Sequence, residues 1–125
     1  MPNDAIHLQK AHRVAKLFCG TKNLDSYCLE ASVVMVEYLR RHQIQAQLIR
    51  REYNGDGHWT IKIDQIEYDP TCADWKTPPA GSIAGQLYTV TNHSTHSAWP
   101  QTKVNETIAY ECVGIRRREY TSVHK

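Results

Sequence analysis

The stretch YCLEASVVMVEYLRRH, residues 27–42, decides how this 125-residue chain folds. Apolar residues fill most of its positions and leave only a thin polar stripe. That stripe consists of Glu30, Glu37 and Arg41. Because Asp25 or Ser26 can cap its start, the pattern predicts a helix from about Tyr27 to His42. A helix that is apolar on most sides is buried, and we expect it at the centre of a domain.

The segment before this helix is amphipathic. Over residues 4–19, apolar and polar side chains recur on opposite faces of a helix, and Gly20 follows as a stop. The apolar face consists of Leu8, Ala11, Ala15 and Phe18. We therefore expect an N-terminal amphipathic helix that packs on the buried one.

The pattern changes to strands after the buried helix. Alternation indicates a first strand from Ile44 to Tyr53, a turn over 54–57, a second strand from His58 to about Asp64 and a third over 66–69. Consecutive strands with such short connections pair antiparallel.

The second strand has two different faces. Alternation directs Trp59, Ile61 and Ile63 towards a core and the other side chains to the opposite side. If Asp64 and Gln65 form a two-residue turn, Asp69 lies across from Thr60 and diagonal to His58, on the same face. A histidine and a carboxylate would then lie within reach of each other.

The remaining third of the chain adds strands. Residues 83–91 alternate in character and predict a strand. For residues 107–115 we expect a strand as well, the alternative being a short helix capped by Asn105 and stopped by Gly114. The sequence thus predicts one α+β domain over residues 1–125. Its N-terminal amphipathic helix precedes a buried helix, which packs on an antiparallel sheet of about four to five strands.

Composition excludes several classes of protein. Hydrophobic residues make up 41% of the chain without an apolar run long enough to cross a membrane. The formal net charge of +2 is too small to indicate a nucleic-acid partner, and Arg116–Arg118 reads as a solvated face. The N-terminus lacks the features of a secretory signal, so we expect the cytoplasm.

The four cysteines are scattered, at positions 19, 28, 72 and 112, without a CxxC pair. This spacing disfavours a redox site or a zinc knuckle, and we expect no cofactor. Cys28 differs from the others because it falls in the first turn of the buried helix, where amide N–H groups and the helix dipole favour a thiolate. It is the candidate nucleophile.

Three motifs agree in order and in predicted structure: Tyr27–Ser32 opens the buried helix, Gly57-His58-Trp59 opens a strand, and Tyr68-Asp69-Pro70-Thr71 ends the next strand. Together they resemble the transglutaminase-like branch of the papain-like superfamily, over residues 25–71. The Cys-Leu start and the strand histidine are also similar to the leader peptidases of lasso-peptide maturation. The resemblance implies a papain-like core with Cys28 as nucleophile, His58 as base and Asp69 orienting the histidine.

The resemblance also implies a reaction. The thiolate would attack a peptide or side-chain amide of a peptide or protein substrate and form a thioester, with hydrolysis favoured over transfer to an amine. Candidates for the oxyanion or substrate contacts are the backbone N–H of Cys28, the side chain of Asn23, Tyr27 and Trp59. The alternation of Trp59 with Ile61 favours a core position for its ring.

Two other readings remain open. A noncatalytic binding module could use the same fold. A metal-binding protein could use histidines and cysteines, among which His93 and His96 are close in sequence. The sequence does not predict the oligomeric state.

Overall fold

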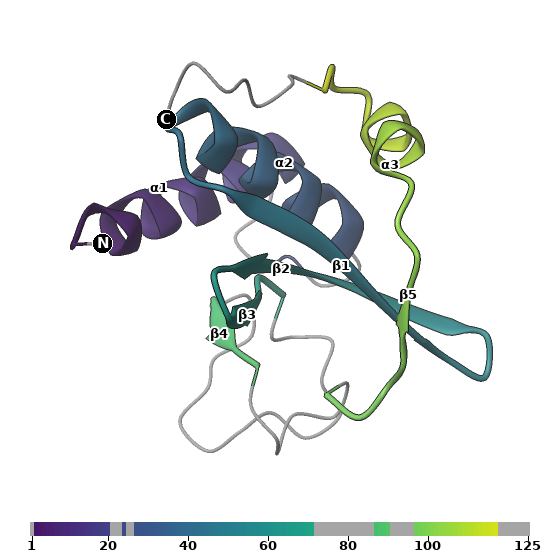
Figure 1. Cartoon of the computed structure of the whole chain (residues 1–125). Coiled ribbons are helices and arrows are strands. Elements are labelled where there is room, and N and C mark those ends of the chain that lie inside the picture. The colour runs from purple at the N-terminus through teal and green to yellow at the C-terminus, as the bar shows by residue number, and fades with distance from the viewer. Residues whose placement is uncertain (1, 21–23, 25–26, 72–86, 91–96, 118–125) are drawn as a thin grey trace.

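The computed structural model describes residues 2–20, 24, 27–71, 87–90 and 97–117 (Figure 1). These residues form an α+β fold, and none of the helices among them has the length and apolar character needed to span a membrane. In chain order the elements are α1 (Pro2–Cys19), α2 (Cys28–Arg41), β1 (Ala46–Tyr53), β2 (Asp56–Ile63), β3 (Ile66–Asp69), β4 (Tyr88–Thr89), β5 (Gln101–Thr102) and α3 (Glu106–Val113).

The described strands form one antiparallel sheet in the order β4-β3-β2-β1-β5. Two tight hairpins set its register. Between β1 and β2, Asn54 and Gly55 have φ angles of 52° and 84°, in the left-handed region that Asn and Gly tolerate best. Between β2 and β3, Asp64 has a φ angle of 54° and Ile63 pairs with Ile66, which confirms the predicted two-residue turn.

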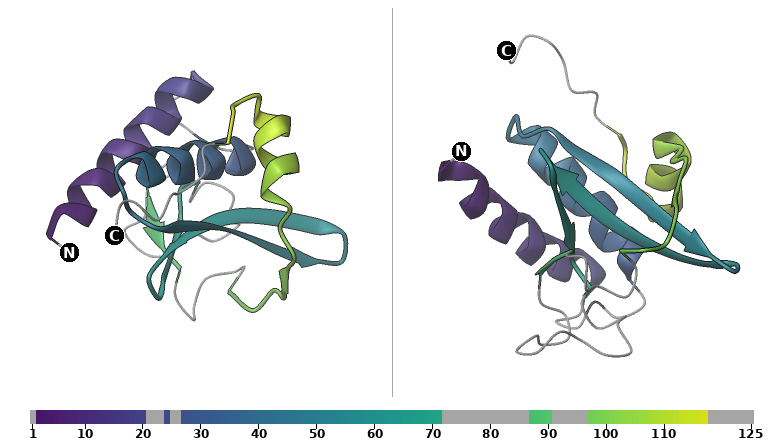
Figure 2. Two further views of the ribbon diagram at one scale, coloured as in Figure 1. Left: turned by 45° about the horizontal axis from the view of Figure 1, so that its top comes forward. Right: turned by 60° about the horizontal axis from the view of Figure 1, so that its bottom comes forward.

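The helices lie together on one side of this sheet, as both views of Figure 2 show. α2 packs against β1, β2, α1 and α3, and eight of its fourteen residues are buried, so the predicted central helix is confirmed. The strand residues that face it belong to the core and define what we call the helix face of the sheet: Ala46, Leu48, Ile61 and Ile63.

The predicted strand over residues 107–115 is wrong, because this segment contains α3. Asn105 caps the helix by accepting a hydrogen bond from the backbone N–H of Ile108 at 3.2 Å, and Gly114 ends it with a φ angle of 82°. Glu106 adds a bidentate pair with Arg40 of α2, at 2.6 and 2.9 Å. The segment is too short for its periodicity to distinguish a helix from a strand. The cap and this ion pair instead determine that it forms a helix.

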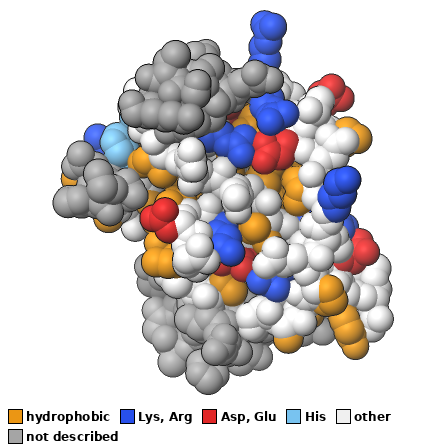
Figure 3. Space-filling model, in the orientation of Figure 1, with side chains coloured by type: hydrophobic (Ala, Val, Ile, Leu, Met, Phe, Trp, Pro, Cys, Tyr) orange, Lys and Arg blue, Asp and Glu red, His pale blue; other side chains and the backbone are white. Residues whose placement is uncertain are grey.

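The predicted strand over residues 83–91 is confirmed only at Tyr88–Thr89, and residues 83–86 and 91 lie outside the described part of the chain. On the face of the molecule shown in Figure 3, basic and acidic side chains are interspersed and form no continuous basic patch among the described residues. This surface agrees with the small net charge of +2.

Candidate functional site

A buried histidine and a buried aspartate meet on neighbouring strands. His58 lies in β2 with 3% of its surface exposed, and Asp69 ends β3 with 0% exposed. Their Nε2 and Oδ2 atoms are 2.7 Å apart. Because a carboxylate oxygen accepts, Nε2 of His58 carries the proton, and in the neutral ring Nδ1 is the nitrogen able to accept one.

The Asp-Pro-Thr sequence holds the second oxygen of this carboxylate. Oδ1 of Asp69 accepts hydrogen bonds from the backbone N–H of Thr71 at 2.8 Å and from its hydroxyl at 3.2 Å. Such a turn, closed by an aspartate side chain two residues back, is common for Asp. Both carboxylate oxygens of Asp69 are therefore held, and the carboxylate has a fixed orientation towards His58.

Further polar side chains share the sheet face that carries this pair. Arg51 is the cross-strand neighbour of His58 and binds Glu67 through Nε and Nη2, at 3.1 and 2.8 Å. Glu67 also accepts from the hydroxyl of Thr60 at 2.6 Å. We call this the polar face of the sheet; it consists of Arg51, His58, Thr60, Glu67 and Asp69.

The polar face is largely buried, and its charges compensate each other. Burial alone would raise the pKa of Glu67, but the hydrogen bonds from Arg51 and Thr60 outweigh burial and hold that pKa below its ordinary value. Nη1 of Arg51 donates to the carbonyl oxygens of Ser97 and Trp99, at 3.1 and 2.7 Å. Arg51 thereby fixes the segment before β5 against the same face.

Cys28 is the first residue of α2, as predicted from the sequence. The residue preceding it, Tyr27, occupies the N-cap position and makes no side-chain capping bond, whereas Asp25 and Ser26, the caps expected from the sequence, lie outside the described residues. The N–H groups of the first turn carry a partial positive charge that favours a thiolate or an oxyanion. Glu30, an acidic residue of the same turn, competes for that charge.

From the lengths and pairing of α2 and β2 we infer that Cys28 and His58 lie towards the same end of β2. Nε of Arg40, near the end of α2, donates to the carbonyl of Ala46 at 3.1 Å, and Ala46 pairs with Ile63 at the end of β2. From there, α2 runs back along the strands (Figures 1 and 2). Cys28 is about 18 Å from Arg40 along the helix and His58 about 17 Å from Ile63 along the strand.

The three predicted catalytic residues are not all joined. His58 and Asp69 are hydrogen-bonded, whereas among the described residues no hydrogen bond connects Cys28 to either of them. Alternation assigns His58 to the polar face, while α2, which carries Cys28, packs on the helix face. The site therefore consists of a fixed dyad and a cysteine at the same end of the sheet.

The other candidate residues have different environments. Trp59 packs against the core, with the guanidinium carbon of Arg50 at 5.8 Å from its ring centre. The same guanidinium covers Gly57, where an added Cβ would lie 2.6 Å from Nη2, so any other residue before His58 would have to displace the Arg50 guanidinium. Tyr27 is 38% exposed beside Cys28, and Asn23 lies outside the described residues.

One residue near the dyad was missed by the sequence reasoning. His12 of α1 is buried, and its Nε2 lies 2.9 Å from the carbonyl oxygen of Pro70, directly after Asp69. Burial lowers the pKa of His12, and Lys16 lowers it further, against the opposite effects of Pro70 and Asp69. The sequence did hold a signal for this residue: His12 lies four positions after Leu8, on the apolar face of the helix, and this spacing predicts that its side chain is buried.

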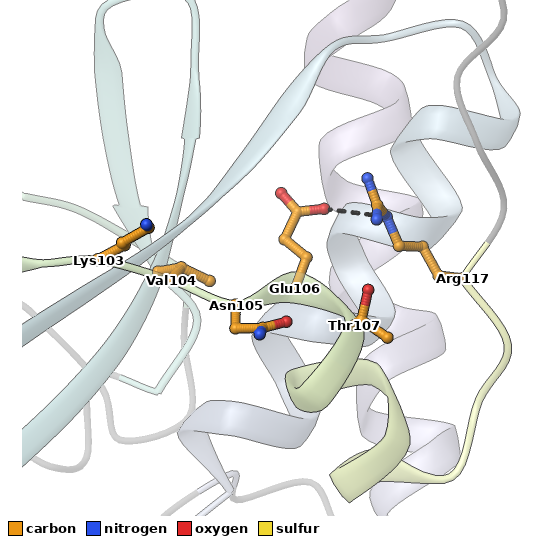
Figure 4. Close-up of a pocket in the computed structure, with 6 residues that line it drawn as sticks. All are labelled: Lys103, Val104, Asn105, Glu106, Thr107 and Arg117. Carbon is orange, nitrogen blue, oxygen red and sulfur yellow. Dashed lines mark ion pairs between the residues drawn. The ribbon is translucent and has the colours of Figure 1, made fainter.

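One cavity lined by described residues lies away from the dyad. It measures about 640 Å³ at the start of α3, where Lys103 and Arg117 flank Glu106 and Arg117 pairs with Glu106 at 3.5 Å (Figure 4). A cavity of about 450 Å³ is lined on the polar face by Arg51 and Glu67, among other residues. Neither cavity is lined by Cys28, His58 or Asp69.

A metal site has no support in the part of the chain that the structure describes, where no three His, Cys, Asp or Glu side chains cluster to hold an ion. His93 and His96, the pair considered from the sequence, lie outside these residues. Cys19, Cys28 and Cys112 are free thiols. The chemistry that these residues offer is that of a thiol and a histidine–carboxylate dyad.

Comparisons with known proteins returned no relative: no family model, no curated protein and no solved structure matches the chain. The class that the coordinates define is an α+β fold with helices over one face of an antiparallel sheet and a buried His–Asp dyad on the other. The relationship to transglutaminase-like enzymes stays a prediction.

Proposed function

We propose that this protein is a cysteine-dependent acyl-transfer enzyme of the transglutaminase-like, papain-like type, with Cys28 as nucleophile, His58 as base and Asp69 as the carboxylate that orients it. The observation that supports this most strongly is the buried contact of 2.7 Å between His58 and Asp69. It sets the tautomer that a general base needs, with Nδ1 as the proton acceptor. The position of Cys28 as the first residue of α2, at the same end of β2, supports its role as the nucleophile.

In the first half of the reaction, Nδ1 of His58 takes the proton of the Cys28 thiol. The thiolate then attacks the carbonyl carbon of an amide, and backbone N–H groups of the first turn of α2 stabilise the oxyanion. When the C–N bond breaks, the imidazolium returns its proton to the departing amine. The products of this half are a thioester on Cys28 and a free amine. This chemistry requires that Sγ of Cys28 and Nδ1 of His58 approach each other at the end of the sheet.

In the second half, His58 deprotonates the acceptor, which attacks the thioester and releases the thiolate of Cys28. Water gives a carboxylic acid and an amine gives a new amide. We favour water, as expected from the resemblance for so small a domain, and a peptide or side-chain amide as the substrate. The protein would then be a peptidase or amidase.

A noncatalytic role is the competing proposal, and one observation favours it. Cys28 has no hydrogen bond to the dyad among the described residues. A buried His–Asp pair can also have a purely structural role, in which it joins two strands. The binding module considered from the sequence would then use this fold without its thiol.

Acyl trapping tests the proposal. The full chain is mixed with p-nitrophenyl acetate near neutral pH, and nitrophenolate release and the mass of the intact protein are followed. We expect a burst with one acetyl group on Cys28, lost in Cys28→Ala and strongly slowed in His58→Ala. Cys112→Ser, which removes an exposed thiol, is the matched control and should keep the burst. Equal acetylation of Cys28 and Cys112 would refute the proposal.

A further inference from the structure

The histidine on α1 is connected to the dyad through a single peptide group. The carbonyl oxygen of Pro70 accepts from Nε2–H of His12 at 2.9 Å. The N–H of Thr71 belongs to the same peptide group and donates to Oδ1 of Asp69 at 2.8 Å. Because a peptide group is planar, its oxygen and its N–H have fixed relative directions. The bond from His12 therefore also sets the direction of the N–H that holds Asp69.

The Asp69 carboxylate is the point where this connection meets the base. Its Oδ1 accepts from the 70–71 peptide group, which His12 holds, and its Oδ2 accepts from Nε2–H of His58 at 2.7 Å. A hydrogen bond to the peptide oxygen polarises the peptide group and strengthens the bond that its N–H donates. Burial of the participating side chains of His12, Asp69 and His58, each at most 5% exposed, keeps water from replacing any of these bonds.

The geometry points to His12 as a positioning residue: by fixing the 70–71 peptide plane from α1, it orients the Asp69 carboxylate and, through it, the ring of His58. This inference rests on the proposed function, because it takes Asp69 as the carboxylate that orients the base. His12 does not contact the reacting atoms. Its effect is on the direction of the Asp69–His58 bond.

Two substitutions at position 12 separate this role from simple packing. His12→Leu keeps apolar volume but has no donor, whereas His12→Gln retains an N–H close to the position of Nε2. The full chain is labelled with isotope-enriched histidine, and the proton signal of His58 Nε2–H is recorded by NMR. Alkylation of Cys28 by iodoacetamide is timed for the same proteins, and their urea unfolding is measured.

We expect His12→Leu to shift and broaden the His58 Nε2–H signal and to slow alkylation of Cys28 about five- to tenfold, the loss typical of one hydrogen bond. His12→Gln should restore both. A purely structural His12 would lower the urea midpoint in His12→Leu but leave the signal and the alkylation rate unchanged in folded protein, and that result would overturn the inference. If His12→Leu does not fold, His12→Met replaces it, because the thioether adapts to irregular space.

The two proposals fail in different ways. If Cys28 of the unaltered chain reacts no faster than Cys112, the proposed function is wrong, and the alkylation rates of the variants carry no meaning. The NMR signal of His58 still decides the positioning role, because it reports the dyad without involving the thiol. An unchanged signal in the donor-free variant overturns the inference whatever the thiol does.

Discussion

The two faces of the sheet are both buried, but by different means. The helix face consists of apolar side chains under α2, of which Ile61 is fully buried. The polar face buries a histidine, two carboxylates and a guanidinium, each compensated by hydrogen bonds. Apolar burial stabilises a fold directly, whereas buried charges contribute little net stability and are costly once a partner is lost. We infer from this difference that the helix face serves folding, and we propose that the polar face serves a role that requires fixed charges.

The two faces must also meet if the proposed reaction is to occur. The proposed nucleophile belongs to the helix covering one face and the proposed base to the other face. We place both at the end of β2 where His58 begins the buried part of the strand. Catalysis therefore requires contact between the two faces at that end. Substitutions can test each face separately, and the reactivity of Cys28 then tests the connection between them.

The largest effect is expected from removing one charge of the polar face. Glu67→Leu leaves Arg51 buried without its carboxylate and Thr60 without its acceptor, and should lower the free energy of unfolding by about 3–5 kcal/mol. The double variant Arg51→Met, Glu67→Leu should recover much of this loss. Urea denaturation measures both. Glu52→Leu, which breaks the more exposed pair with Arg50, is the control and should cost about 1 kcal/mol or less.

A cavity in the helix face should lower the free energy of unfolding slightly less than the loss of Glu67 does. Ile61→Ala removes a fully buried side chain and should lower the free energy of unfolding by about 2–5 kcal/mol in the same assay. Because the helix face is assigned to folding, alkylation of Cys28 in the folded variant should stay within about twofold of the unaltered chain. A large loss of Cys28 reactivity with little loss of stability would show that the division between the faces is wrong.

Acid should destabilise the protein through groups on both sides of the sheet. Hydrogen bonds from Arg40 hold the pKa of Glu106 below its ordinary value of 4.5, and the pKa of Glu67 is also lowered. Each contributes stability above about pH 4.5, lost as the pH falls through its folded-state pKa. The lowered pKa of His12 also makes the protein less stable in acid. This loss begins below about pH 6.5, the ordinary pKa of histidine, because the unfolded chain then binds more protons than the folded one.

The measurement is the urea midpoint at several pH values between about 7 and 3. We expect the midpoint to fall as the pH is lowered, and to fall less steeply below about pH 6.5 in His12→Gln, which cannot take up a proton. A midpoint that rises on acidification would contradict the expected signs of these three pKa shifts.

The smallest change in the free energy of unfolding is expected at the start of α3. Asn105→Ala removes the side chain that accepts from the N–H of Ile108 and should cost about 1 kcal/mol in urea unfolding. Asn105→Asp, which keeps an accepting oxygen, is the matched control and should cost little. No loss in the alanine variant would mean that α3 depends on the Arg40–Glu106 pair alone.

Much of the fold was predictable because long segments repeat one pattern. The apolar run after Cys28 extends over several helical turns and so predicts α2. The alternation that ends at Ile63 extends over several pairs of residues and so predicts β2. The face shared by His58 and Asp69 also followed from alternation and a two-residue turn. The segment of α3 is short, and its structure depends on a cap and on an ion pair with Arg40, a partner 66 residues away that local sequence does not reveal.

The sequence predicted those parts of the site that depend on residues close to one another in the chain. The turn that holds Asp69 follows from Asp-Pro-Thr, and the start of α2 from the apolar run after Cys28. The bond between His12 and Pro70 joins residues 58 positions apart and depends on how α1 packs, so spacing alone could not find it. The separation between Cys28 and His58 is likewise a property of two packed layers.

The rate of alkylation at individual cysteines tests the central claim most directly, because it reports whether the dyad acts on the thiol. The full chain is treated with limiting iodoacetamide near neutral pH, and labelling of Cys19, Cys28, Cys72 and Cys112 is resolved by peptide mass spectrometry. We predict that Cys28 reacts at least about tenfold faster than Cys112, although Cys112 is more exposed, and that His58→Ala removes this advantage. Equal rates at Cys28 and Cys112, unchanged by His58→Ala, would contradict the claim that the dyad activates this thiol.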